Sequence, residues 1–212
     1  MSKKLIKFLP LVLLLILTFF LRIIKIEQLF YFTYDESIPA FVARRLILWQ
    51  HIPLIGGVTP FNLHLGPYFY WFYSILLFIG SLNPIIWGYA GAVIATVTTF
   101  LLYKLGENLG SKKLAITAAI FWTASYLANI YDRHLWALYW GPPISLVVIF
   151  CLYKIIISQK AKNPKSFDKY TCILGITIAF GIHADLSNLA FLVLSIIAWI
   201  FYKIPVKKSA II

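Results

Sequence analysis

The chain is poor in charge, and above all in negative charge. Only 12% of its 212 residues are Asp, Glu, Lys or Arg, seven of them acidic, whereas 61% are hydrophobic. Soluble domains carry about 25% charged residues, so the composition excludes an ordinary soluble protein. The mean hydropathy of +0.86 instead predicts an integral membrane protein.

Cysteines and metal-binding motifs are also scarce. The two cysteines, Cys151 and Cys172, fall in apolar stretches, which favours packing roles over a disulfide framework. The sequence has no CxxC or HExxH motif, no Walker loop and no Gly-rich turn between strand and helix, so we expect no metal centre or nucleotide site of those kinds. The net charge of +12 lies in loops between apolar stretches, which indicates lipid as the partner and not nucleic acid.

Apolar stretches recur along the whole chain. Four of them reach roughly the 17 residues that a membrane-spanning helix needs, and two more are shorter or less uniform. In order they are Leu5–Leu21, Pro84–Tyr103, Leu114–Tyr131, Trp140–Ile157, Tyr170–Ile182 and Leu186–Tyr202. No small-residue cleavage site follows the first, so we interpret it as an uncleaved helix. We predict one all-α integral membrane domain over residues 1–212, with about six transmembrane helices.

Positive charge alternates between the two sides of this predicted bundle. Fourteen lysines lie in one set of loops and chain ends, and five basic residues lie in the other. The positive-inside rule places the first set of loops and both chain termini on the cytoplasmic side. We expect the protein to lie in the plasma membrane. This topology requires that Tyr68–Ile79 does not cross the membrane. Its twelve residues give about 18 Å of helix, whereas the hydrocarbon core of a bilayer is roughly 30 Å thick.

The first external loop, about residues 25–83, is the long one. Tyr68–Ile79 is rich in aromatic residues, which is typical of a helix at the membrane interface. Earlier in the loop, apolar residues recur at helical spacing and predict an amphipathic helix in the membrane plane. These residues are Ile38, Phe41, Val42, Leu46 and Trp49.

Ionisable residues gather on the predicted external side. They are Asp35, Glu36, His64, Asp132, Arg133, His134, His183 and Asp185. Such groups at a membrane edge are functional candidates, because leaving them unpaired there is costly. A cavity roofed by the two interfacial helices would gather them. Structural roles stay open as well: Asp35 as a helix N-cap with Glu36 in the first turn, His134 as a surface residue, and the others as ordinary loop residues.

Short motifs follow one another in a characteristic order. They are Thr33-Tyr34-Asp35-Glu36, Arg44-Arg45-Leu46, His64-Leu65-Gly66-Pro67-Tyr68 and Tyr131-Asp132-Arg133-His134-Leu135-Trp136. In this order they resemble the N-terminal half of GT-C membrane glycosyltransferases, closest to family 39. That group is protein mannosyltransferase-like and includes the aminoarabinose lipid A transferases. Family members usually run to more than twice this length, so the resemblance implies a truncated N-terminal portion.

The resemblance implies transfer of a sugar from a polyprenyl-phosphate donor to an acceptor lipid, glycan or protein at the external membrane face. Asp35 would be the base that deprotonates the acceptor hydroxyl, with Glu36 beside it. Arg133 would contact the departing phosphate, and the remaining substrate ligands would be His64, Asp132 and His183. Participation of a divalent cation is left open.

Two other functions stay open. A transporter or lipid flippase would use the external acids to carry protons or cations, although no pair of Gly/Pro-broken helices indicates an inverted repeat. The other alternative is a transferase fragment without activity of its own. An Asp35→Asn variant distinguishes the three, through loss of transfer, loss of ion-coupled uptake or no effect.

Overall fold

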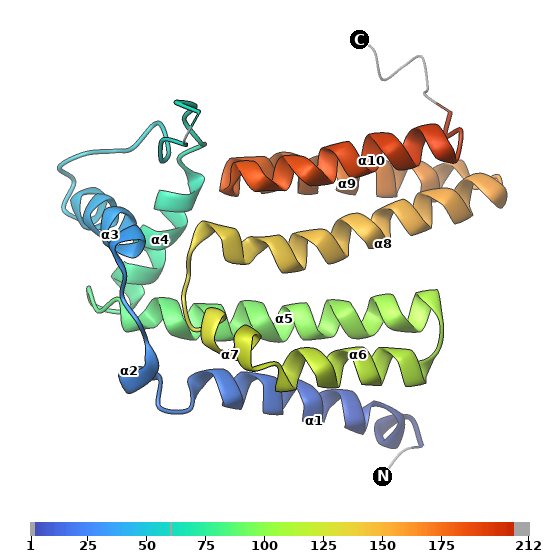
Figure 1. Cartoon of the computed structure of the whole chain (residues 1–212), viewed down its shortest axis with the longest axis horizontal. Helices are drawn as coiled ribbons and strands as arrows, with labels where there is room; N and C mark the ends of the chain where they lie inside the picture. Colours follow the sequence, from blue (N-terminus) through green and yellow to red (C-terminus); the bar gives the residue numbers. More distant parts are fainter. Residues whose placement is uncertain (1–2, 60, 206–212) are drawn as a thin grey trace.

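The computed structural model describes residues 3–59 and 61–205. Over these residues it contains ten α-helices, two 3-10 helices and no strand beyond one bridge between Val58 and His64. Six of the α-helices run side by side as a bundle (Figure 1). They are α1 (Lys3–Ile23), α5 (Ile85–Leu109), α6 (Lys112–Ala124), α8 (Gly141–Lys160), α9 (Pro164–Ala184) and α10 (Leu189–Phe201). The all-α prediction is confirmed.

The remaining elements gather at one end of the bundle. The helices α3 (Tyr34–Ile47) and α4 (Tyr68–Ile79) lie across this end, which we call the α3/α4 end (Figure 1). The short elements there are α2 (Ile26–Leu29), α7 (Tyr126–Tyr131), η1 (Ala137–Trp140) and η2 (Leu186–Asn188). The first turn of α1 and the last turn of α10 lie at the opposite end, which we call the terminal end.

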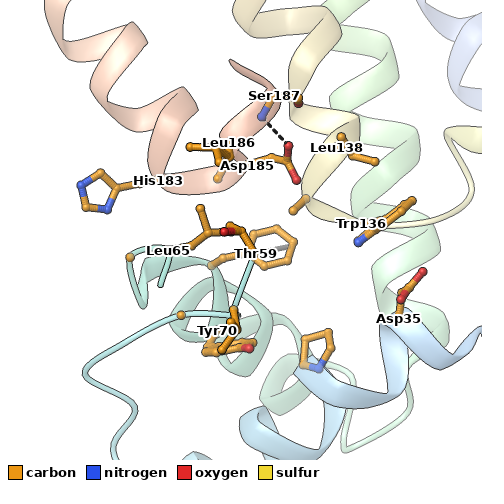
Figure 2. A pocket seen from close by; sticks show the side chains of 18 of the residues that line it. Asp35, Thr59, Leu65, Tyr70, Trp136, Leu138, His183, Asp185, Leu186 and Ser187 are labelled. Carbon is orange, nitrogen blue, oxygen red and sulfur yellow. Dashed lines mark hydrogen bonds between the residues drawn. The ribbon is translucent and has the colours of Figure 1, made fainter. Parts of the chain in front are cut away.

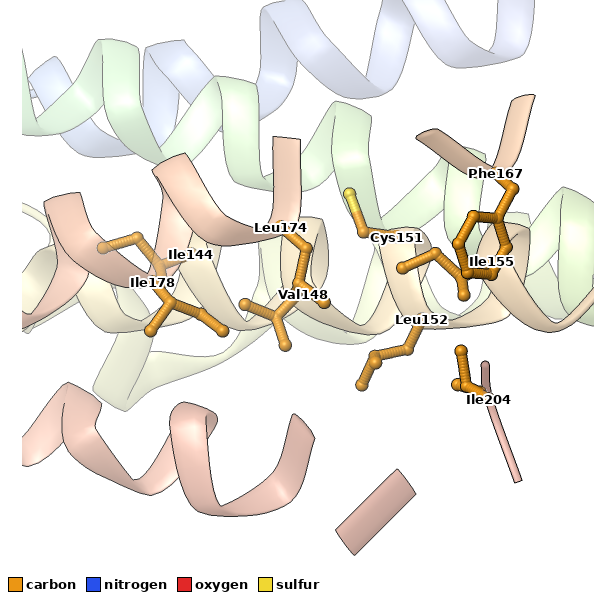
Figure 3. Close-up of a cluster of buried hydrophobic side chains, with 9 residues drawn as sticks. All are labelled: Ile144, Val148, Cys151, Leu152, Ile155, Phe167, Leu174, Ile178 and Ile204. Atoms are coloured by element: carbon orange, nitrogen blue, oxygen red, sulfur yellow. The ribbon is translucent and has the colours of Figure 1, made fainter. Parts of the chain in front are cut away.

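The bundle is held together by apolar packing and by close helix contacts. Buried side chains of α8 and α9, with Ile204, form one core cluster (Figure 3). On α5, small residues let its neighbours approach: a Cβ at Gly106 would lie 2.6 Å from the Cα of Ala115 on α6, and a Cβ at Gly91 would collide with the carbonyl oxygen of Asp132. Close approach over small residues is typical of helix packing in membranes.

Two segments of the described chain, Ile85–Leu109 and Ala137–Lys160, are long and apolar enough to cross a membrane by length and composition. Three further apolar helices are shorter, with 10–17 residues: Phe8–Ile23, Tyr68–Ile79 and Leu186–Phe201. Large apolar side chains also point outward along the bundle, among them Ile16, Phe121 and Ile200.

Two helices differ from the sequence-based expectation. The predicted span Leu114–Tyr131 is broken at Ser125, whose backbone is extended and whose side chain accepts a hydrogen bond from the Ala128 amide to cap α7. Helix α3 packs on α4 through a face of Glu36, Pro39 and Ala43, and leaves the expected apolar stripe exposed at Ile38 and Phe41. A small-residue face brings two helix backbones close, which the larger side chains of the stripe would prevent.

Candidate functional site

A cavity of about 1060 Å³ lies at the α3/α4 end. Its walls come from α3, α4, residues 136–138 and the turn between α9 and α10, together with a hairpin formed by residues 56–59 and 63–65 (Figure 2). Most of the lining is apolar or aromatic, including Phe69, Tyr70 and Trp136. Besides the Tyr70 phenol, the ionisable groups among the described lining residues are two carboxylates and one imidazole, with no Lys or Arg: Asp35, His183 and Asp185.

Asp35 enters the cavity from the first turn of α3. The N-cap of this helix is Thr33, whose extended backbone leads into a capping box with Glu36. The Glu36 Oε2 atom accepts hydrogen bonds from the Thr33 amide at 2.6 Å and from the Thr33 hydroxyl at 3.1 Å. The interpretation of Asp35 as the N-cap is therefore wrong, because Thr33 holds that position. This leaves the Asp35 side chain exposed on the cavity wall.

The two adjacent carboxylates have different environments. Successive residues of an α-helix point about 100° apart, so Asp35 and Glu36 cannot share a face. The Glu36 side chain is 2% exposed, and its Oε1 atom lies 2.9 Å from Nδ1 of His134. The expectation of His134 as a surface residue is wrong: only 10% of its side chain is exposed, and its ring lies among those of Phe30, Tyr31 and Tyr139. Glu36 is therefore withdrawn from the cavity.

Asp132 and Arg133 are engaged with α1. The Asp132 carboxylate lies 3.0 Å from the guanidinium of Arg22, whose side chain is fully buried. Burial raises the pKa of Asp132 from 3.8 to about 6, although the nearby charges of Arg22 and Arg133 lower it. The sequence-based roles of Asp132 and Arg133 as substrate ligands stay predictions, but neither residue lines the cavity.

Two arginines cap the ends of two neighbouring helices, α1 and α6. Arg133 donates to the carbonyls of Leu21 at 2.9 Å and Arg22 at 3.2 Å, which are terminal carbonyls of α1. Arg22 in turn donates to the carbonyls of Thr123 at 3.0 Å and Trp122 at 3.2 Å, at the end of α6. The last carbonyls of a helix lack partners within it, and the forked guanidinium supplies them. The exchange fixes the end of α1 against the α6–α7 break.

The hairpin forms one wall of the cavity. Its backbone bonds include the Gly56 amide to the Leu65 carbonyl at 2.7 Å and the Thr59 amide to the Leu63 carbonyl at 2.8 Å. His64 is exposed on this hairpin and does not line the cavity. Gly56 lies so close to the Gly66 carbonyl that a Cβ would collide there, so the hairpin requires glycine at this position.

The cavity rim is closed by contacts with the end of α9. The His183 ring packs directly on Gly66, where a Cβ would collide with its Nδ1 atom. Tyr68 donates its hydroxyl to the Phe180 carbonyl at 3.0 Å. Asp185 caps η2 by accepting the Ser187 amide at 2.8 Å, and its side chain lies across the cavity from Asp35 (Figure 2).

The structure therefore brings together part of the predicted site. Asp35 and His183 share the cavity, whereas Glu36 is paired behind it, Asp132 and Arg133 anchor α1, and His64 lies outside. Sequence reasoning missed Glu36 as a capping residue, although Thr33-x-x-Glu36 is a recognisable signal. It also missed His134 and Arg22 as buried partners. In the described part of the chain, no cluster of three His, Cys, Asp or Glu side chains is placed to hold a metal ion.

Comparisons with known proteins add no relationship: no family model, no curated protein and no solved structure matches the chain.

Proposed function

We propose that the chain is a GT-C-like membrane glycosyltransferase module that transfers a sugar from a polyprenyl-phosphate donor to an acceptor at the external membrane face, with Asp35 as the base. The observation that carries this proposal is the placement of Asp35. It is the exposed member of the carboxylate pair, and it lines a large, mostly apolar cavity at the bundle end away from both terminal helix turns.

In this proposal the six bundle helices span the membrane and both termini are cytoplasmic. Two of them have the length and composition of spans, and outward-pointing apolar side chains on α1, α6 and α10 suit contact with lipid. The terminal end carries most of the lysines, as expected of a cytoplasmic side. The short α4 lies across the other end, in keeping with an interfacial helix.

The chemistry follows from the lining. The Asp35 carboxylate takes the proton of the acceptor hydroxyl while the oxygen forms a bond to the anomeric carbon. The bond from that carbon to the donor oxygen breaks, and the lipid phosphate leaves with the electron pair. Trp136 and Tyr70 offer aromatic surface to a sugar ring or an isoprenoid chain.

The lining also restricts where the phosphate binds. The described walls contain no Lys or Arg, so His183 at the rim is the available cationic partner when it is protonated. We therefore place the phosphate at the rim and the isoprenoid chain along the apolar walls. A divalent cation is the other source of positive charge, and the experiment below includes it.

The test uses the purified chain in proteoliposomes with radiolabelled polyprenyl-phosphate-mannose and polyprenyl-phosphate-glucose, plus a membrane extract as acceptor. We expect Asp35→Asn to reduce transfer by ~10²–10⁴-fold, the usual range for loss of a general base. The matched control is Glu27→Gln, an exposed acid on α2 that does not line the cavity. A parallel reaction with a chelator reports on a divalent cation.

Unchanged sugar transfer by the Asp35→Asn variant would rule out Asp35 as the base. Absence of transfer by the unmodified chain, combined with proton- or cation-coupled uptake that Asp35→Asn abolishes, would favour the transporter function instead.

A further inference from the structure

The first turn of α3 is held to the rest of the molecule differently from its second half. The second half packs on α4, where Ala43 is fully buried in a cluster with Phe69 and Tyr73. In the first turn, Asp35 is exposed, and the Ser37 hydroxyl donates to the Tyr34 carbonyl within the same turn. Within the described residues, the bond from His134 to Glu36 is the side-chain hydrogen bond that ties this turn to another part of the fold.

His134 itself lies on a rigid support. The backbone around it fits a notch in α5, where a Cβ at Gly91 would collide with the Asp132 carbonyl and would lie 3.1 Å from the His134 carbonyl. The preceding residues are fixed by the Arg22–Asp132 ion pair and by the bonds from Arg133 to α1. The following residue, Leu135, is 1% exposed in the same cluster as Ala43.

The contact therefore joins a fixed segment to the turn that carries the cavity acid. Glu36 follows Asp35 directly in the chain. If Glu36 is displaced because its bond to His134 is lost, Asp35 is therefore displaced with it. The Glu36 Oε2 atom accepts two hydrogen bonds from Thr33, and the Oε1 atom lies at hydrogen-bond distance, 2.9 Å, from Nδ1 of His134. Because both groups are almost fully buried, loss of either partner would leave the other without its hydrogen bond in the interior, which is costly.

We propose that His134 is a positioning residue, which acts through Glu36 to hold the Asp35 carboxylate at its place on the cavity wall. The catalytic part of this inference rests on the proposed function, and the structural part does not. A displacement of about 1 Å in a reacting group can cost ~10²-fold in rate. A base on the first turn of an exposed helix therefore needs a hydrogen bond such as His134–Glu36 to hold it in position.

The chain offers a matched set of variants. His134→Leu removes the donor and keeps an apolar side chain in the ring's place. His134→Asn keeps a nitrogen donor at the δ position and should restore the bond. Tyr73→Phe removes a neighbouring hydroxyl that is buried beside Glu36 but has no hydrogen-bond partner among the described residues, so it should leave the turn in place.

The first measurement is the mobility of a nitroxide attached to Ile38→Cys, which lines the cavity one turn after Asp35. The background carries Cys151→Ala and Cys172→Ser, and the protein is in proteoliposomes. We expect a several-fold faster nitroxide motion in His134→Leu, and near-unmodified motion in both His134→Asn and Tyr73→Phe. Unchanged motion in a folded His134→Leu protein would overturn the proposal.

The second measurement is transfer from the polyprenyl-phosphate donors. His134→Leu should lower kcat by ~10–10²-fold at constant donor KM, because the donor still binds while the base is displaced. His134→Asn should recover most of kcat. An equal loss in both variants would contradict positioning through the δ nitrogen. Faster nitroxide motion in His134→Leu, with no transfer by any variant or by the unmodified chain, would support the positioning role and refute the proposed function alone.

Discussion

The two ends of the bundle use charge in opposite ways. The α3/α4 end and its loops contain five basic and five acidic residues, whereas the described part of the terminal end contains twelve lysines and two acids. Over the described residues the excess of positive charge therefore belongs to one end. At the α3/α4 end some of the charged groups are paired inside the fold, as in the Arg22–Asp132 and Glu36–His134 pairs. At the terminal end most of the lysines whose burial the structure describes are exposed.

The choice of basic residue follows the same division. All four arginines lie at the α3/α4 end, and every described lysine except Lys25 lies at the other. With one guanidinium each, Arg22 reaches two helix carbonyls and Arg133 reaches three, which a single ammonium group cannot match in geometry. Three lysines of the terminal end instead lie beside aromatic rings, as Lys154 does at 5.2 Å from the Phe150 ring centre. The buried arginines of one end therefore serve internal contacts, and we expect the exposed lysines of the other end to face anionic lipid.

Removal of Arg22 should give the largest effect on stability. Arg22→Met leaves the Asp132 carboxylate buried without its partner and removes one of the two hydrogen bonds that each of the Trp122 and Thr123 carbonyls accepts. The expected loss is about 3–5 kcal/mol of unfolding free energy, as for other broken buried pairs. Chemical unfolding in detergent measures it. The control is Arg44→Met, an exposed arginine of the same end, and an equal loss there would contradict the division between buried and exposed arginines.

The pH dependence of unfolding should report Asp132. Its pKa is raised on folding, so its contribution to stability is fully present below about pH 4 and is lost as the pH rises through about 6. A shift of this size corresponds to roughly 2–3 kcal/mol. Unfolding free energies measured between pH 4 and pH 7 should therefore fall with pH, and Asp132→Asn should flatten the curve. A rise with pH in the unmodified chain would show that the Arg22 attraction outweighs burial.

A pair of glycine substitutions should have opposite signs. Gly91→Ala forces α5 away from the Asp132 carbonyl, at a cost of about 1–3 kcal/mol for an overpacked contact. Gly175→Ala, on α9, meets nothing within 4 Å and should stabilise by about 0.4–1 kcal/mol through the unfolded state. Thermal unfolding of the two variants measures the difference. If both variants are destabilised, the effect comes from helix flexibility and not from the close contact between Gly91 and the Asp132 carbonyl.

The smallest effect should appear in lipid preference. Lys160→Gln with Lys162→Gln removes two exposed ammonium groups of the terminal end and should weaken preference for anionic lipid by about 1 kcal/mol for each lysine. Co-purified lipid, compared after reconstitution in anionic and zwitterionic mixtures, measures it. Arg44→Gln with Arg45→Gln is the matched pair at the other end. A larger change in that pair would reverse the assignment of the anion-facing end.

The elements of the fold were largely predictable, because apolar runs and helical spacing are local properties. The bounds Tyr68–Ile79 of α4 were predicted to the residue, since Pro67 and Gly80 delimit an aromatic run. The break at Ser125 was not, because the apolar composition continues through it and a single serine gives little signal. The divergence of Asp35 from Glu36 was available from helix geometry, since neighbours in a helix face different directions.

The buried pairs of the candidate site were out of reach of local patterns. His134 and Glu36 are 98 residues apart, and Arg22 and Asp132 are 110 apart. No spacing rule links such positions, and only the packed fold brings them together. Sequence reasoning therefore gathered the right charged residues at one end but could not sort them into those that line the cavity and those that hold its walls.

The helix caps formed by Arg22 and Arg133 have a consequence for biosynthesis. The end of α1 takes its hydrogen bonds from Arg133, which follows Leu21 by 112 residues. At about 5–20 residues per second, a ribosome needs roughly 5–20 s to make that interval. During this time the first helix exists with Arg22 and its last carbonyls still lacking their final partners. Its stable docking must therefore wait for α6 and α7, so the nascent chain assembles this corner of the bundle late.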